Sequence, residues 1–91
     1  MNTGRGAITR RNEFKLRDWN DARILIACAE QGSFAAAAAV LKQDQTTVSR
    51  RIGQLEAAVG RPLFRRRRSG ATPTVVGLAL VERARAMAAA V

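Results

Sequence analysis

Two helical segments lie close together in the middle of the chain, and the short break between them restricts the possible folds. Residues 34–41, FAAAAAVL, have strong helix propensity, and their small side chains let another helix approach closely. Only Lys42 and Gln43 separate this segment from Asp44, the expected N-cap of a helix over residues 45–59. That second segment carries an apolar stripe at helical spacing, made of Val48, Ile52, Leu55 and Val59.

The flanking residues predict two further helices. A first helix begins after Asp18, a suitable N-cap, and ends at Gly32. Ser33 is the expected N-cap of the helix over 34–41, and Thr74 is the expected N-cap of a last helix over 75–91. The apolar face of the first helix is expected to consist of Trp19, Ala22, Leu25, Ile26 and Ala29.

Residues 63–73 predict a small β-hairpin. The pieces LFRRRR and ATP lie on either side of Ser69-Gly70, where we expect the turn, and Leu63-Phe64 should anchor the first strand in the core. Two helices joined by a short break and followed by a hairpin are typical of a winged helix-turn-helix. The expected fold is therefore all-α with a small β-hairpin: three helices plus a wing over residues 16–74, followed by a long helix over 75–91.

The net charge limits the possible partners. Sixteen Lys and Arg against seven Asp and Glu give +9 in a chain of 91 residues, enough for one small domain. Nucleic acid is the usual partner of such a chain, and an anionic membrane surface is the main alternative. The longest uncharged apolar run, residues 34–41, is far shorter than the roughly 18 residues that span a bilayer. A cytoplasmic location without membrane insertion fits best.

The residue types also argue against catalysis. The chain has no His and one Cys, so it has no intrachain disulfide, no His/Cys metal cluster and no histidine base. Cys28 lies in the apolar run ILIACA and is expected to be a small core residue. We therefore expect no enzyme, no metal and no cofactor in this chain.

Residues 1–15 form a basic N-terminal extension with two glycines and no apolar period. We expect this extension to be disordered, as chain termini usually are. Basic arms of this kind can also lie along DNA, which remains the alternative.

The polar face of residues 45–59 has the composition of a DNA-recognition helix. Opposite the apolar stripe lie Thr46, Arg50 and Gly53, flanked by Gln45, Thr47 and Ser49. Glutamine can pair with adenine, arginine with guanine, and a threonine methyl can contact thymine. Ser49 can contact a base or a phosphate. A solvated polar face is the alternative, but no acidic residue interrupts this face before Glu56, and the whole chain is basic.

The last helix carries two apolar stripes where a lone surface helix needs one. One contains Val76, Leu80 and Met87, and the other contains Gly77, Val81, Ala84 and Ala88. We expect one stripe to pack on the domain and the first, Val76, Leu80 and Met87, to pair with the same helix of a second chain. A two-fold dimer would read a near-palindromic site. A single broad buried face is the alternative.

An ordered set of motifs runs through the chain: Gly32-Ser33-Phe34, Ala37-Ala38, TVSRRI over residues 47–52, Leu55-Glu56, Gly60, Leu63-Phe64, Thr74 and Gly77. Over about residues 17–86 these motifs resemble the N-terminal DNA-binding domain of LysR-type transcriptional regulators. The resemblance implies a bacterial regulator bound to DNA in the nucleoid, with a dimerising linker helix and a higher oligomer in the full-length protein. It also implies an effector-binding domain for a small molecule, which is absent here.

The resemblance assigns roles by position. Gln45, Thr46, Ser49 and Arg50 match base and phosphate readers, and Ser33 matches a phosphate contact. Arg66 and Arg67 match the part of the wing that meets the backbone or the minor groove, while Arg65 and Arg68 are less clearly placed. The chain departs from the common pattern at residues 44–47, at Arg65, and at Val75 and Leu78, whose apolar side chains suggest that the last helix buries more surface than usual.

The sequence therefore predicts site-specific binding to double-stranded DNA. The alternative is a basic protein that binds any nucleic acid through charge alone, with equal affinity for every duplex and a steep dependence on salt.

Overall fold

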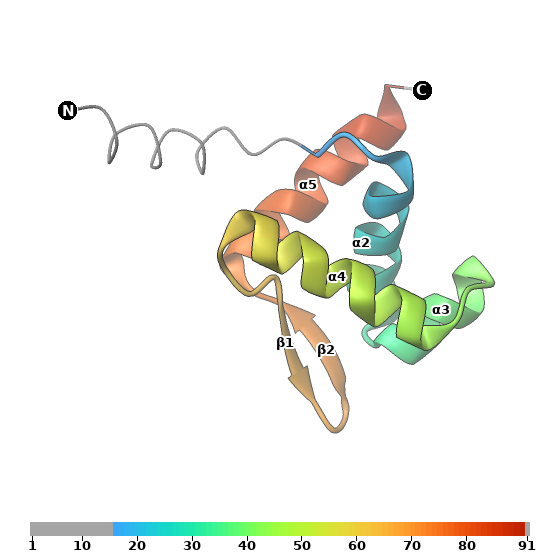
Figure 1. The fold of residues 1–91 in the computed structure, drawn as a ribbon. Coiled ribbons are helices and arrows are strands. Elements are labelled where there is room, and N and C mark those ends of the chain that lie inside the picture. Colours follow the sequence, from blue (N-terminus) through green and yellow to red (C-terminus); the bar gives the residue numbers. More distant parts are fainter. Residues whose placement is uncertain (1–15, 91) are drawn as a thin grey trace.

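The computed structural model describes residues 16–90 and has the element order expected from the sequence (Figure 1). Helices α2 (Trp19–Gln31), α3 (Phe34–Leu41) and α4 (Gln45–Val59) are followed by strands β1 (Phe64–Arg67) and β2 (Gly70–Pro73) and by helix α5 (Val75–Ala89). The two strands form one antiparallel hairpin, which projects from the helices as a wing. The basic extension expected over residues 1–15 lies outside the described residues.

Within residues 16–90, three of the four helix starts are capped by the side chain expected from the sequence. Asp18 Oδ1 accepts from Asn20 N at 2.8 Å, Ser33 Oγ from Ala36 N at 3.0 Å, and Thr74 Oγ1 from Gly77 N at 3.0 Å. The expectation for Asp44 was only half right. Its extended backbone occupies the N-cap position of α4, but its side chain makes no capping hydrogen bond. Asp44 is exposed, so water can solvate its carboxylate instead.

The short α3–α4 turn is built by backbone conformation. Lys42 adopts a left-handed conformation with φ 58°, and its N–H bonds back to the end of α3. Gln43 N donates to Ala38 O at 3.0 Å, and the Gln43 side chain donates to Asn20 Oδ1 of α2 at 3.2 Å. The turn therefore brings the start of α4 directly beside the end of α3.

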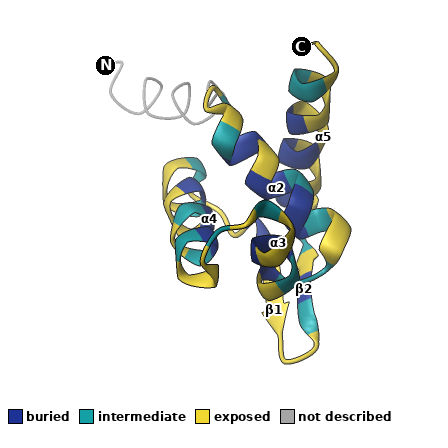
Figure 2. Ribbon diagram, turned by 90° about the vertical axis from the view of Figure 1, so that its right-hand side faces the viewer, coloured by how far each residue is buried: buried dark blue, intermediate teal, exposed yellow. Residues whose placement is uncertain are grey.

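The core lies where α2, α3, α4 and α5 meet, and the apolar stripes of α3 and α4 face it (Figure 2). The buried residues of α4 are Val48, Ile52 and Leu55, as expected, and Val59 is partly buried. Leu63 and Phe64 are buried too, which anchors the hairpin. Cys28 is fully buried, in agreement with its expected role as a small core residue.

The buried face of α2 differs from the expected one. Of the expected residues, Ala22 and Leu25 are fully buried and Ile26 and Ala29 are partly buried, whereas Trp19 is 44% exposed. Ile24 and Cys28, which were not expected on this face, are fully buried as well. At about 100° per residue, Trp19 lies on the side of the helix opposite Cys28. Because three other helices contact α2, its buried face is broader than one stripe and is rotated away from the face that the apolar pattern indicated.

The hairpin turn also differs by one residue. Arg67 pairs with Gly70 and Arg66 with Ala71, so Arg68 and Ser69 form the turn and Gly70 belongs to β2. The glycine is required by a close approach. Gly70 has φ 146°, a Cβ there would lie 2.3 Å from Gly32 O, and the next residue, Ala71, donates its N–H to that same oxygen at 2.8 Å. The wing is thereby fixed against the α2–α3 turn.

Candidate nucleic-acid interface

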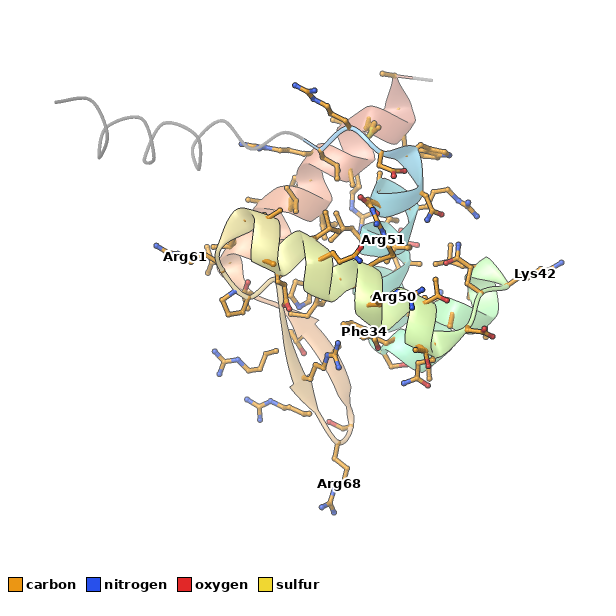
Figure 3. The ribbon with its side chains drawn as sticks, viewed as in Figure 1. Phe34, Lys42, Arg50, Arg51, Arg61 and Arg68 are labelled. Carbon is orange, nitrogen blue, oxygen red and sulfur yellow. The ribbon has the colours of Figure 1, made fainter. Side chains whose placement is uncertain are left out.

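The packing of α4 on the core determines which of its side chains are buried and which are exposed. Gln45, Thr46 and Arg50 are exposed, and Thr47 and Ser49 are half-buried. Figure 3 shows Arg50 on the N-terminal half of α4. All five side chains lie on the first turns of the helix, the part that reaches base edges when such a helix enters a major groove.

An open groove lies between the starts of α3 and α4 and the wing. Its volume is about 410 Å³, and the predicted contact residues Ser33, Gln45, Arg66 and Arg67 all line it. The structure thus brings four positions together that are up to 34 residues apart in the sequence. Thr46, Thr47, Ser49 and Arg50 do not line this groove and lie further along α4.

Ser33, which lines this groove, has a structural role as the N-cap of α3. Its hydroxyl oxygen accepts from Ala36 N, while its backbone carbonyl accepts from Ala37 N at 3.0 Å and so begins the helical ladder. The cap leaves other N–H groups at the start of α3 without a helical acceptor, since the first turn of any helix has no carbonyls before it. Such groups are well suited to an anionic ligand.

The pleat of the strand directs the arginines of the wing alternately to its two faces. Arg66 and Arg68 line the groove beside α3, and Arg65 lines a separate cavity on the other face, between the wing and the start of α5. Arg67 borders both. Arg68 lies at the tip of the wing (Figure 3), so it is as well placed as Arg66. The sequence left the role of Arg68 less clear and placed the turn one residue later, at Ser69-Gly70.

Arg66 is held in place by an aromatic ring. Its guanidinium carbon lies 4.4 Å from the centroid of the Phe34 ring, and Phe34 packs edge-on against Phe64 with centroids 5.6 Å apart. The charge of Arg66 also acts on the buried Cys28: desolvation raises the pKa of the Cys28 thiol to about 12, and the positive charge of Arg66 offsets only part of that effect. The Cys28 thiol therefore stays protonated near neutral pH.

The residues expected to pair two chains are not free in this structure. Leu80 is 5% exposed and packs in the core together with Val81 and Ala84, while Val76 and Met87 are partly buried against it. The reason is that α5 packs along α2. The large apolar residues of α5 that stay exposed are Val75, at 84%, and Leu78, at 51%, so within this chain these two add little to the surface that the last helix was expected to bury.

Within residues 16–90, no helix combines the length and apolar character needed to cross a membrane. The same part of the chain contains no cluster of three or more His, Cys, Asp or Glu side chains that could hold a metal ion.

Three helices, a two-stranded wing and a polar, basic surface over the start of α4 define a winged helix-turn-helix DNA-binding domain. Residues 19–78 match the model of the bacterial regulatory helix-turn-helix proteins of the lysR family. The chain belongs to the LysR family of transcriptional regulators.

Similar proteins agree with this assignment. The HTH-type transcriptional regulator AbaB of Streptomyces antibioticus is 44% identical over 62 residues, which are 68% of this chain and 21% of AbaB. The CbnR DNA-binding domain, solved as a complex with DNA, superimposes with a TM-score of 0.74 at 35% identity and covers 78% of this chain and 82% of that one. Full-length LysG of Corynebacterium glutamicum, solved with bound effector Arg, has a TM-score of 0.73 at 33% identity, over 79% of this chain and 24% of LysG.

The chain spans between 17% and 32% of the length of the curated relatives that it matches. The similarity therefore concerns the DNA-binding part of these regulators.

Proposed function

We propose that this domain reads a specific site in double-stranded DNA, with α4 in the major groove and the wing on the flanking backbone or minor groove. The observation that carries the proposal is the groove in which Ser33, Gln45 and Arg66 meet. When the start of α4 lies in the major groove of a duplex, the phosphate backbone at the edge of that groove would contact the start of α3 and the wing.

The proposed roles follow from what each side chain offers. Gln45 and Arg50 can make bidentate contacts with adenine and guanine, and Thr46 and Thr47 can contact a thymine methyl. Ser49, half-buried, is suited to a phosphate or a base at the edge of the groove. The N–H groups at Ser33, together with Arg66, Arg67 and Arg68, would hold the backbone.

Binding driven by charge alone is the competing function, because the chain carries a net charge of +9. Selection of bound sites from a pool of random duplexes separates the two. Site-specific binding yields an enriched consensus and an affinity difference between consensus and random duplex that persists at 200 mM salt. Charge-driven binding yields no consensus and similar affinities for all duplexes, each falling steeply with salt.

We also propose that the regulator binds DNA as a dimer through α5, now with Val75 and Leu78 rather than Leu80 in the contact. The support is that these two side chains stay exposed after α5 has packed on α2. Sedimentation of the chain, free and with consensus DNA, tests this. We expect a dimer on DNA that Leu78→Glu weakens, and a monomer in both conditions would overturn it.

The remaining roles concern the whole regulator. We propose that it acts in the bacterial cytoplasm, on the nucleoid, and that a further domain binds a small-molecule effector and supports a higher oligomer. The relatives are several times longer than this chain, which leaves room for such a domain. The domain itself requires no cofactor for this function.

A further inference from the structure

The side chains of Asp21, which is buried, and Arg51, which is half-buried, form an ion pair between α2 and α4. Within residues 16–90, Asp21 is the charged residue that the fold buries, with 5% of its surface exposed. Arg51 donates from Nε to Oδ1 at 2.9 Å, and from Nη2 to Oδ1 at 2.6 Å and to Oδ2 at 2.7 Å. Both carboxylate oxygens are therefore engaged by one guanidinium, the geometry that gives an Arg–carboxylate pair its directional character.

The rest of the Arg51 guanidinium is also occupied. Nη1 donates to Gln54 Oε1 of the same helix at 2.6 Å, and Nη2 lies 3.7 Å from Asp18 Oδ2 at the start of α2. The hydrogen bonds to Asp21, together with the charges of Asp21 and Asp18, raise the pKa of Arg51 beyond its already high value, against a smaller opposing effect of burial. The guanidinium of Arg51 is thus held largely by α2.

Arg51 directly follows Arg50, the proposed base-reading residue. Consecutive side chains on a helix point about 100° apart. When Arg51 is held against α2, Arg50 is turned outward, where it is exposed (Figure 3). The pair therefore holds Arg51 on the α2 side of the helix, next to an Arg50 that faces outward.

The other contacts between α2 and α4 are mostly non-directional. Val48, Ile52 and Leu55 bury apolar surface against the core, and apolar packing tolerates small rotations of a helix better than a bidentate ion pair does. One further directional contact, from Gln43 to Asn20, lies in the turn before α4. The buried stripe of α4 thus sets its orientation coarsely, and the contact between Arg51 and Asp21 adds a directional constraint on the remaining rotation of α4 about its own axis.

We propose that Asp21 is a positioning residue for base recognition, which acts through Arg51 to set the rotation of α4 in the major groove. The proposal rests on the proposed function. Asp21 itself lies on α2 and touches no base. Its effect is on the ratio between the affinities for consensus and random duplex, because only base contacts require a defined rotation of the helix, whereas phosphate contacts tolerate a range of rotations.

The test compares Asp21→Asn with a matched control, Glu30→Gln. Glu30 also pairs with an arginine, Arg85, at 3.0 Å, but both side chains are about half exposed and lie between α2 and α5, away from α4. Each substitution removes one negative charge from α2, so each should raise the affinity for random duplex by a similar small factor. We expect Asp21→Asn to lower the consensus-to-random affinity ratio about tenfold, the discrimination lost with one good base contact, and Glu30→Gln to leave it unchanged.

A third variant, Arg51→Lys, keeps the net charge and removes the bidentate geometry. We expect the same fall in the affinity ratio with no change in affinity for random duplex. Circular dichroism at the assay temperature identifies folded protein, and a partly unfolded variant loses affinity for both duplexes by the same factor, which leaves the ratio intact. If Asp21→Asn does not fold, Arg51→Lys decides the matter.

The outcomes separate the two proposals. Wild-type protein without any preference for a consensus overturns both the proposed function and the positioning role. A wild-type preference that survives unchanged in folded Asp21→Asn, or in Arg51→Lys if Asp21→Asn does not fold, overturns the positioning role alone.

Discussion

The guanidinium of Arg66 lies over the ring of Phe34, 4.4 Å from its centroid, and so joins the wing to the first residue of α3. Phe34 is buried and meets Phe64 edge-on, at an interplanar angle of 85°, so the ring beneath the arginine is itself fixed. An arginine stacked in this way has lost part of its conformational freedom before any DNA binds. Less entropy then has to be lost on binding, which favours affinity.

Replacing Phe34 with Leu should weaken DNA binding through Arg66. The variant keeps an apolar side chain in the core but removes the aromatic face, and we expect a loss of about 0.5–1 kcal/mol in binding free energy. A double-mutant cycle with Arg66→Ala measures the coupling by titration of consensus DNA. If the two losses simply add, the stacking does not contribute to binding.

Replacing Arg50 with Ala should relax base choice at one position of the consensus, at a cost of about 1–3 kcal/mol for the preferred base. Arg61→Ala is the matched control, because it removes the same charge from an exposed site just beyond the end of α4. Competition titrations with duplexes altered at each position provide the measurement. A uniform loss across all sequences would show that Arg50 contacts only phosphate.

Among the wing arginines, Arg66 and Arg68 should contribute to the salt dependence of binding, and Arg65 should not. Each alanine substitution that removes a phosphate contact is expected to reduce the slope of log K against log salt by about 0.9. Arg65 serves as the internal control, since it lies on the face of the wing turned away from the groove. Equal slopes for all three variants would contradict this division.

Gly77→Ala should destabilise the domain. A Cβ at this position would lie 1.9 Å from Leu63 O, where the chain enters the wing, and we expect a loss of about 1–3 kcal/mol or more in the free energy of unfolding. Gly53→Ala is the control: it lies inside α4 with nothing within 4 Å of a Cβ, and should gain about 0.5–1 kcal/mol. Urea unfolding of both variants measures the difference, and a stable Gly77→Ala protein would contradict the close approach.

The stability of the domain should fall as the pH rises above 9. In the folded state the pKa of Cys28 is about 12, against 9.0 for an exposed thiol, so between these values the unfolded chain loses a proton that the folded chain keeps. The contribution is complete below pH 9 and decreases by up to about 1.4 kcal/mol per pH unit until pH 12. Cys28→Ala should show a shallower decrease in urea unfolding over this window. Identical slopes would mean that the thiol titrates normally in the folded protein.

Local signals in the sequence were enough to predict the elements. Asp18, Ser33 and Thr74 cap the helices that they were expected to cap, and the bounds of α3 and α4 agree with those expected from helix propensity and from the Gly60 stop signal. These features depend on interactions between residues that are only a few positions apart. Such interactions form wherever the backbone adopts that local geometry. The stripe of α4 was equally clear, because three of its four members are fully or nearly buried.

The sequence by itself thus determined the order and the starts of the helices, the presence of the hairpin and the basic character of the domain, while α5 ends at Ala89 rather than at the expected residue 91. Only the tertiary structure decided which faces meet. It exposed Trp19, buried Leu80, moved the hairpin turn to Arg68-Ser69 and paired Arg51 with Asp21, 30 residues away. The physical reason is that periodicity shows that a helix has an apolar face, but the exact rotation and the partner of that face follow from packing among four helices at once.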